Sequence, residues 1–376
     1  MLTAFRNGRI LSESGFVTGK TLLVNDGRVE GLTNADLVDA SVVDLGGLDL
    51  VPGFIDVQVN GGGGVLFNED PSVASIAAIA RAHRQFGTTG FLPTLISDDL
   101  QVVERGIAAV REAIAQGVPG VLGIHVEGPF LSHDKRGVHD PAKLRALDAE
   151  AVKLLATPHG GVTLVTLAPE TTTPELIRAL SDAGVIVSAG HTNATFDELQ
   201  PALASGLRGF THLFNAMSGL GSREPGAVGA ALADERSWCG IIVDGHHVHS
   251  QTLRIALRAK RRDRFMLVTD AMPSVGAETT SFQIQGRHIT VNGNKIVDDE
   301  GRLAGAHLDM ASAVRNAVRL LGLDLTDAVR MASAHPAAFL GLGDRVGRIA
   351  PGQRANFVLL DGNLEVRRTW IDGIAA

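Results

Sequence analysis

Residues 120–128, GVLGIHVEG, form a short apolar run that ends beside a carboxylate, Glu127. Seven other runs of similar texture follow one another along the middle of the chain: VPGFIDVQV (51–59), TTGFLPTLI (88–96), GVTLVTLAP (161–169), VIVSAGHT (185–192), GFTHLF (209–214), CGIIVDG (239–245) and FMLVTDA (265–271). A strand that is covered on both faces needs apolar residues at almost every position, so such runs are typical of buried parallel strands. The sequence therefore predicts eight strands of one parallel sheet.

Stretches with helical periodicity separate most of these runs. In the clearest, four apolar residues recur at the spacing of one helix face: Val103, Ile107, Val110 and Ile114. Strands that alternate with helices indicate an α/β protein, and eight such units fit a (β/α)8 TIM-type barrel better than an open sheet. An open, doubly wound sheet stays compatible with the pattern, because periodicity does not reveal whether a sheet closes.

The two ends of the chain differ in texture from the middle. Residues 1–50 alternate apolar and polar positions around Asn-Gly and Asp-Gly pairs, which favour hairpin turns. Residues 345–376 again have the pattern of strand, turn and strand, so we expect both ends to pair into one small β domain that is discontinuous in sequence. The barrel is then expected over residues 51–344, with residues 281–303 as a β insertion after its eighth strand.

Composition excludes several classes of protein. The chain has 376 residues, with 34 Lys plus Arg against 41 Asp plus Glu, and a formal net charge of −7. This acidity, without a block of basic residues, argues against nucleic acid or a membrane surface as the main partner. The single cysteine, Cys239, excludes an internal disulfide framework and a multi-cysteine zinc module. No apolar run has the length of a membrane helix or of a secretory signal, so we expect a soluble, cytoplasmic protein.

Polar residues follow the apolar runs, at the end of a barrel where active sites gather. They are Gln58, Asn60, Glu127, His191, His212, Asp244, His246, His247 and Asp270. Glu127, His191 and His212 end the third, fifth and sixth strands, where one carboxylate and two imidazoles could share a divalent metal and leave a position for water. Each of the three could equally be a hydrogen-bonded residue of its own loop.

Two further residues are candidates for chemistry. Asp270, at the end of the eighth strand, would face the barrel mouth, where it could take a proton from a metal-bound water and deliver it to a leaving group. It could also simply cap the following turn. Arg223 lies among the turn-forming residues of GSREPG, where a guanidinium group is either solvated or clamps a phosphate or carboxylate.

Six motifs, in this order along the chain, resemble one known family. They are VPGFIDVQVNGGGG (51–64), GIHVEGPFLSHDKRGVHDP (123–141), SAGHTNATFDE (188–198), THLFNAMSGLGSREPG (211–226), VDGHHVH (243–249) and LVTDAMPSVGA (267–277). Together with HPAAFLGL (335–342) and GRIAPGQRANFVLLD (347–361), they resemble the N-acetylglucosamine-6-phosphate deacetylases of the amidohydrolase superfamily. The resemblance covers nearly the whole chain.

The resemblance implies a (β/α)8 barrel with a small β-sandwich domain formed by both termini. It also implies a metal-dependent hydrolase that converts N-acetylglucosamine 6-phosphate into glucosamine 6-phosphate and acetate. By the match of motifs, Glu127, His191 and His212 would hold the metal and Asp270 would be the catalytic acid/base. The positions that match substrate contacts are Val138, His139, Asn215, Ala216, Arg223, His247, Ala304 and Gly305. Similar enzymes are homodimers, so we expect a homodimer in which Arg223 is contributed across the interface.

Gln58 and Asn60 stand where many amidohydrolases carry a His-x-His pair that holds a second metal. Neither amide is a favoured ligand of transition metals. We therefore expect the second-metal position to be lost and one divalent metal ion, Zn2+, to be bound per subunit.

Three alternative functions stay open. A deacetylase on the same scaffold could act on N-acetylgalactosamine 6-phosphate or on an unphosphorylated amino sugar, although Arg223 and His247 favour a phosphorylated substrate. A catalytically silent sugar-phosphate-binding protein is disfavoured, because the three ligand candidates and Asp270 are all present. A cyclic-amide hydrolase such as a dihydroorotase usually needs the His pair that Gln58 and Asn60 replace.

Overall fold

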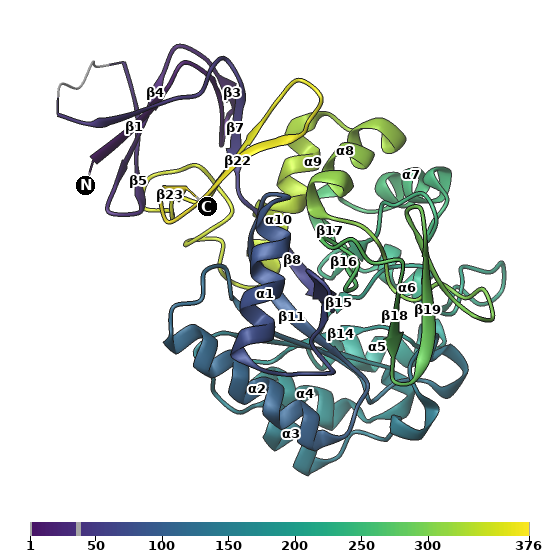
Figure 1. Ribbon diagram of the computed structural model, residues 1–376. Coiled ribbons are helices and arrows are strands. Elements are labelled where there is room, and N and C mark those ends of the chain that lie inside the picture. Colours follow the sequence, from purple (N-terminus) through teal and green to yellow (C-terminus); the bar gives the residue numbers. More distant parts are fainter. Residues whose placement is uncertain (1, 35–38, 376) are drawn as a thin grey trace.

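The computed structural model describes residues 2–34 and 39–375. Its centre is an eight-stranded parallel sheet in the order β17-β16-β15-β14-β13-β12-β11-β8 (Figure 1). The strands are β8 (Phe54–Val59), β11 (Thr88–Ile96), β12 (Gly123–Glu127), β13 (Val162–Leu167), β14 (Ile186–Ala189), β15 (Leu207–Phe210), β16 (Trp238–Ile241) and β17 (Phe265–Leu267). Each overlaps one of the eight apolar runs, which confirms the predicted α/β barrel.

The first and last strands of this sheet meet without a regular ladder. Just beyond the strand ends, the backbone N–H of Asp270 donates to the carbonyl of Gln58 at 3.1 Å, and that of Asn60 donates to Ala271 at 2.9 Å. These bonds join β17 to β8 and nearly close the barrel. They also bring the polar residues after the first and eighth strands together at the carboxyl end of the sheet.

The helices lie outside the barrel (Figure 1). They are α1 (Val73–Arg84), α2 (Leu100–Ala115), α3 (Ala149–Leu155), α4 (Pro174–Asp182), α5 (Phe196–Ala204), α6 (Gly226–Ala233), α7 (Ser250–Ala259), α8 (Met310–Leu321), α9 (Leu325–Ala332) and α10 (Ala334–Phe339). Short 3-10 turns lie between strands and helices at η1 (His133–Lys135), η2 (Pro141–Lys143), η3 (Pro169–Thr171) and η4 (Arg262–Arg264). In α2, Val103, Ile107 and Val110 are buried against the barrel, as their spacing predicts.

Strands from both chain ends form two further sheets (Figure 1). The four-stranded sheet has the order β5-β4-β1-β6 and contains β1 (Leu2–Arg6), β4 (Thr21–Asn25), β5 (Arg28–Thr33) and β6 (Ser41–Asp44). The six-stranded sheet has the order β23-β22-β21-β7-β2-β3 and contains β2 (Arg9–Ser12), β3 (Gly15–Val17), β7 (Asp49–Pro52), β21 (Phe357–Leu360), β22 (Val366–Ile371) and β23 (Ile374–Ala375). Val51 in β7 pairs with Val358 in antiparallel β21, so the two ends share one sheet.

A separate apolar core holds the two terminal sheets together. It contains Phe5, Ile10, Leu22, Val24, Val29, Leu45, Leu50, Ile349, Ala355, Phe357, Leu359 and Trp370. The ring of Phe5 lies edge-on to those of Phe357 and Trp370, with centroids 5.5 and 5.4 Å apart. This small β domain, built from both ends, confirms the predicted architecture. The domain limits of 1–50 plus 345–376 and of 51–344 stay a prediction.

An antiparallel insertion covers part of the carboxyl end of the barrel. It consists of β18 (Ser281–Ile284), β19 (Arg287–Asn292) and β20 (Lys295–Asp298), within the predicted segment. Its isoleucines share a small core with Val138 and Met272. Beside it, β9 (Gly61–Gly62) and β10 (Val65–Leu66) form a short hairpin. Among the described residues, no helix combines the length and apolarity needed to cross a membrane.

Candidate active site

Three buried side chains from different strands converge at the carboxyl end of the barrel. Glu127 is the last residue of β12, whereas His191 and His212 follow the ends of β14 and β15 by two residues. Nε2 of His212 lies 2.9 Å from Oε1 of Glu127 and 3.1 Å from Nε2 of His191. The Nε2 of His191 is itself 3.3 Å from the same carboxylate oxygen. We refer to these three residues as the Glu-His-His cluster.

The backbone at the two histidines is strained. His191 and His212 have φ angles of 48° and 32°, in the left-handed region that non-glycine residues rarely adopt. Such conformations persist where the surrounding structure holds them, and they are frequent at functional sites. The strain is therefore a second sign, beside the convergence, that these loop positions serve the site.

The Glu-His-His cluster fits a divalent metal. A tetrahedral ion with bonds of about 2.0–2.1 Å holds its ligand atoms about 3.3–3.4 Å apart, close to the three separations found here. The carbonyl of Lys135 accepts a hydrogen bond from Nδ1 of His191 at 2.8 Å, so Nε2 of the neutral ring carries the lone pair that a metal needs. Burial alone would raise the pKa of the Glu127 carboxyl, but contacts with both imidazoles hold it well below its usual range.

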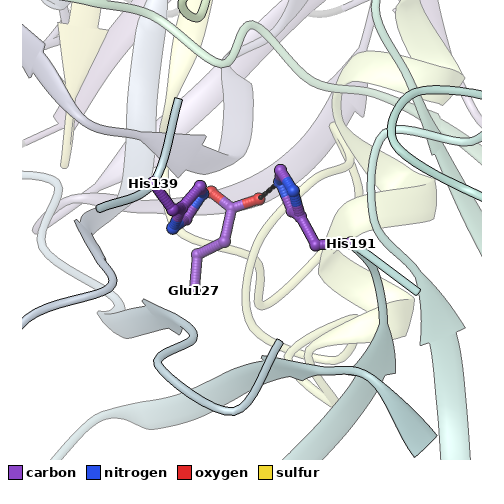
Figure 2. A group of neighbouring side chains, drawn as sticks. All are labelled: Glu127, His139 and His191. Carbon is purple, nitrogen blue, oxygen red and sulfur yellow. Dashed lines mark ion pairs between the residues drawn. The ribbon is translucent and has the colours of Figure 1, made fainter. Parts of the chain in front are cut away.

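His139 lies on the opposite side of the Glu127 carboxylate from His191 (Figure 2). The atoms of Glu127, His139 and His191 that could bind a metal lie within 4.8 Å of one another, so distance alone also admits His139 as a metal ligand. Its hydrogen bonds favour another role. The backbone N–H of Ser97 donates to Nδ1 of His139 at 3.2 Å, and the hydroxyl of Ser97 lies 2.7 Å from the same nitrogen. Because a backbone N–H can only donate, Nδ1 accepts and the proton of the neutral ring is on Nε2. Burial lowers the pKa of His139 to about 3, so the ring stays neutral and its Nε2 is a donor.

Asp270 lies close to the Glu-His-His cluster and is 9% exposed. Asn60 donates its side-chain amide to Oδ1 of Asp270 at 2.7 Å. Gln58 donates to the same oxygen at 3.2 Å and to Oε2 of Glu127 at 3.0 Å, so it links the two carboxylates. Burial, assisted by the negative charge of Glu127, raises the pKa of Asp270 to about 6. A carboxyl with this pKa can both accept and release a proton near neutral pH.

The Glu-His-His cluster, His139 and Asp270 line one cavity of about 330 Å³, whose wall does not include Gln58 or Asn60. Among the positions singled out in the sequence, those in its wall are Glu127, Val138, His139, His191, His212, Asn215, Ala216, His247, Asp270 and Gly305. Ala304 is fully buried beside Gly305 and is not part of the wall. Arg223 lies on an exposed loop and does not line the cavity of its own chain.

A model of the amidohydrolase family matches residues 50–375, which contain the barrel and every residue of the cavity. The chain belongs to the amidohydrolase family. It is 45% identical to the N-acetylgalactosamine-6-phosphate deacetylase of Shewanella sp. (strain ANA-3), over 97% of this chain and 93% of that protein.

Two solved amidohydrolase structures are similar over the whole chain. The crystal structure of N-acetylglucosamine-6-phosphate deacetylase from Pasteurella multocida has a TM-score of 0.97 and 35% identity, with 100% of both chains covered. An Asp-to-Ala mutant of the Mycobacterium smegmatis N-acetyl-D-glucosamine-6-phosphate deacetylase, in complex with N-acetyl-D-glucosamine-6-phosphate, has a TM-score of 0.92 and 31% identity. That match covers 100% of this chain and 98% of the other.

In this amidohydrolase, Gln58 and Asn60 use their amide N–H groups toward the carboxylates of the site. A metal ligand must instead present a lone pair. Both amides are therefore oriented as hydrogen-bond donors toward the carboxylates, and the loss of the second-metal position stays a prediction.

Several residues in the cavity wall were not singled out in the sequence. They are Ile96, Asp134, Lys135, Gly137, Met272, Arg302 and Leu303. Lys135 and Gly137 flank the predicted contacts Val138 and His139, so their position in that motif was a usable signal. Arg302 and Leu303 directly precede the predicted contacts Ala304 and Gly305, so the same signal was available for them. Ser97, which binds His139, directly follows the second apolar run, so the rule that polar residues at strand ends face the site would have found it.

Proposed function

We propose that this amidohydrolase removes the N-acetyl group of N-acetylglucosamine 6-phosphate and yields glucosamine 6-phosphate and acetate. The observation that carries the proposal is the convergence of the Glu-His-His cluster and Asp270 in one cavity. The similarity to solved deacetylases of this sugar phosphate, at 35% and 31% identity over the whole chain, supports the choice of substrate.

The residues of the cavity divide the chemistry of amide hydrolysis among them. Glu127, His191 and His212 would hold a divalent ion, for which we expect Zn2+, and that ion would supply the Lewis acidity needed to polarise the acetamide carbonyl and activate water. Asp270 accepts the proton of the attacking water and delivers it to the amine nitrogen as the C–N bond breaks. The Nε2–H of His139 is a donor available to the oxygen on which negative charge develops.

The phosphate serves as a remote handle that positions the acetamide. Asn215 and Ala216 lie in the cavity wall and are the contacts that this chain would offer to it. A phosphate-binding arginine would come from the partner subunit of a homodimer, as its Arg223. The chain's own Arg223 lies outside its own cavity. We further propose that the enzyme is cytoplasmic, as expected from the sequence.

A second substrate has specific support. The relative from Shewanella sp. is named for N-acetylgalactosamine 6-phosphate and shares 45% identity with this chain. The two sugars differ only in the orientation of the hydroxyl at C4, so the acetamide and the phosphate are held in the same places. The same catalytic residues would therefore serve both epimers, and contacts to C4 would decide between them.

Acetate release by the zinc-supplemented protein tests the proposal. We expect release from N-acetylglucosamine 6-phosphate and little from unphosphorylated N-acetylglucosamine. Faster release from N-acetylgalactosamine 6-phosphate would assign the second substrate instead. The Asp270→Asn variant is the control, and its kcat should fall by about 10²- to 10⁴-fold, since an amide cannot take the proton. No release from any of the three sugars would contradict the proposal.

A further inference from the structure

The turn after β16 contains an aspartate–histidine pair at the edge of the cavity. Oδ1 of Asp244 accepts the backbone N–H groups of His246 and His247, at 2.8 and 2.9 Å. Its second oxygen, Oδ2, lies 2.6 Å from Nδ1 of His247. The two side chains are only 4% and 7% exposed. One carboxylate therefore holds both the backbone and the imidazole ring of His247.

This contact determines which nitrogen of His247 carries a proton. An ionised carboxylate only accepts hydrogen bonds, so Nδ1 must be the donor and Nε2 is the nitrogen left for other partners. Burial would raise the pKa of Asp244, but its bonds to His247 and to the turn lower it to about 2, so the carboxylate stays ionised. His247 lines the same cavity as Glu127 and Asp270.

We infer that Asp244 is a positioning residue that keeps His247 protonated on Nδ1 and turns its Nε2 toward the substrate. The identity of that substrate rests on the proposed function, whereas the orientation of the ring does not. The arrangement is the reverse of that at His139, where a backbone N–H of Ser97 places the proton on Nε2. The cavity thus holds one histidine whose Nδ1 donates and another whose Nδ1 accepts.

Nitrogen NMR of the zinc-loaded protein, labelled with ¹⁵N-histidine, tests the tautomer directly. The signals of His247 are those lost in the His247→Asn variant. We expect Nδ1 of His247 to be protonated in the unchanged protein. In Asp244→Asn, the side-chain carbonyl oxygen of the asparagine can still accept the two backbone N–H groups of the turn. Its side-chain NH2 group then faces Nδ1 of His247. Because this group can only donate, the proton of the neutral ring should move to Nε2. A neutral His247 with a bare Nδ1 in the unchanged protein would overturn the inference, whatever the substrate.

Kinetics of hydrolysis test whether the orientation matters for function. We expect Asp244→Asn to lower kcat/KM by about 10- to 100-fold, the range found when the partner that orients a metal-bound histidine is removed. The matched control is Asp234→Asn. Asp234 accepts the backbone N–H groups of Arg236 and Ser237 at 3.0 and 2.7 Å, the same turn without a histidine contact, and it lies outside the cavity. Its replacement should leave kcat/KM unchanged.

A double variant separates positioning from a general loss of stability. If Asp244 acts through His247, Asp244→Asn should have little further effect once His247→Asn is present. Full additivity of the two changes, or unaltered kinetics in Asp244→Asn, would overturn the inference. Circular dichroism shows whether each variant is folded, and the NMR measurement on the unchanged protein decides the tautomer independently of both. If the unchanged protein hydrolyses none of the sugars, the proposed function fails while the tautomer result still stands.

Discussion

Asn60 donates its side-chain amide to Oδ1 of Asp270 at 2.7 Å, a shorter bond than the 3.2 Å bond from Gln58. A hydrogen bond to the charged form of a carboxyl lowers its pKa, whereas burial raises it. The pKa of Asp270, about 6, therefore reflects burial and the charge of Glu127, partly offset by His212, His247 and the hydrogen bond from Asn60. Through this bond, Asn60 lowers the pKa of the carboxyl to which we assign the acid/base role.

The pH dependence of hydrolysis follows from this bond. Asp270 must be ionised to accept a proton, so kcat/KM should fall as the pH drops through about 6. Asn60→Ala removes a donor to the charged form, raises the pKa of Asp270 and should move this acidic limb to higher pH. Asn356→Ala, which removes a buried amide in the terminal β domain, is the control and should leave the limb in place. If the acidic fall in kcat/KM occurs at the same pH or at a lower pH in Asn60→Ala, the assignment of Asp270 is contradicted.

Metal content should distinguish two possible ligand sets. We expect about one divalent ion per chain, and loss of that ion in His212→Asn, because Nε2 of His212 completes the Glu-His-His cluster. His139→Asn should retain the ion, since Nδ1 of His139 is occupied by Ser97 and its Nε2 carries a proton. Elemental analysis of the purified variants measures both. Metal loss in His139→Asn with retention in His212→Asn would replace our ligand set with the group of Glu127, His139 and His191.

Mixing two inactive variants tests the shared site. Arg223→Ala should lack the phosphate contact and Asp270→Asn the acid/base. A mixed dimer would have one site that combines the intact Asp270 of one chain with the intact Arg223 of the other. Equal amounts of the two chains, unfolded and refolded together, should then recover about a quarter of the unaltered activity. No recovery, although light scattering shows that dimers have formed, would mean that each chain completes its own site.

The stability of the protein should depend on pH through Asp56. This carboxyl is fully buried and accepts hydrogen bonds from Thr269 Oγ1 at 2.5 Å and from two backbone N–H groups. Burial raises its pKa from 3.8 to about 7. Between these values the unfolded chain has released the proton and the folded chain still holds it, so a rise in pH favours unfolding.

Asp56→Asn removes this titration and is the reference for measuring it. The free energy of unfolding of the unaltered protein, minus that of Asp56→Asn, should decrease as the pH rises from about 4 to about 7 and then level off. Urea unfolding at several pH values measures both proteins, and the other titrating groups cancel in the difference. A difference that stays constant or grows over this range would contradict the assignment.

Much of the fold follows from local sequence pattern. Eight apolar runs predict the barrel strands, because a buried parallel strand needs apolar residues on both faces. The hairpin texture of both ends predicts the small β domain. The seam of the barrel could not be predicted, since it depends on backbone bonds between residues more than 200 positions apart, such as Asp270 and Gln58.

The candidate site, like the fold, could be predicted only in part. The polar residues at strand ends predict which side chains gather, since the carboxyl ends of parallel strands meet at one face. Their proton positions could not be predicted, because these depend on distant partners. Ser97 contacts Nδ1 of His139 through both its backbone N–H and its hydroxyl, and Lys135 accepts a hydrogen bond from His191 through its backbone carbonyl. A backbone group is the same whatever the side chain, so sequence motifs carry no signal for its contacts.

The pairing of β7 with β21 has a consequence for how the chain is made. Val51 lies opposite Val358, so the ribosome synthesises about 300 residues between the two partners, which takes about 15–60 s at 5–20 residues per second. During that time, β2, β3 and β7 can pair with one another, but the edge of β7 that will receive β21 has no partner. We therefore expect the barrel to form before the terminal sheet is complete, and the nascent amino-terminal strands to be the segment that chaperones must protect.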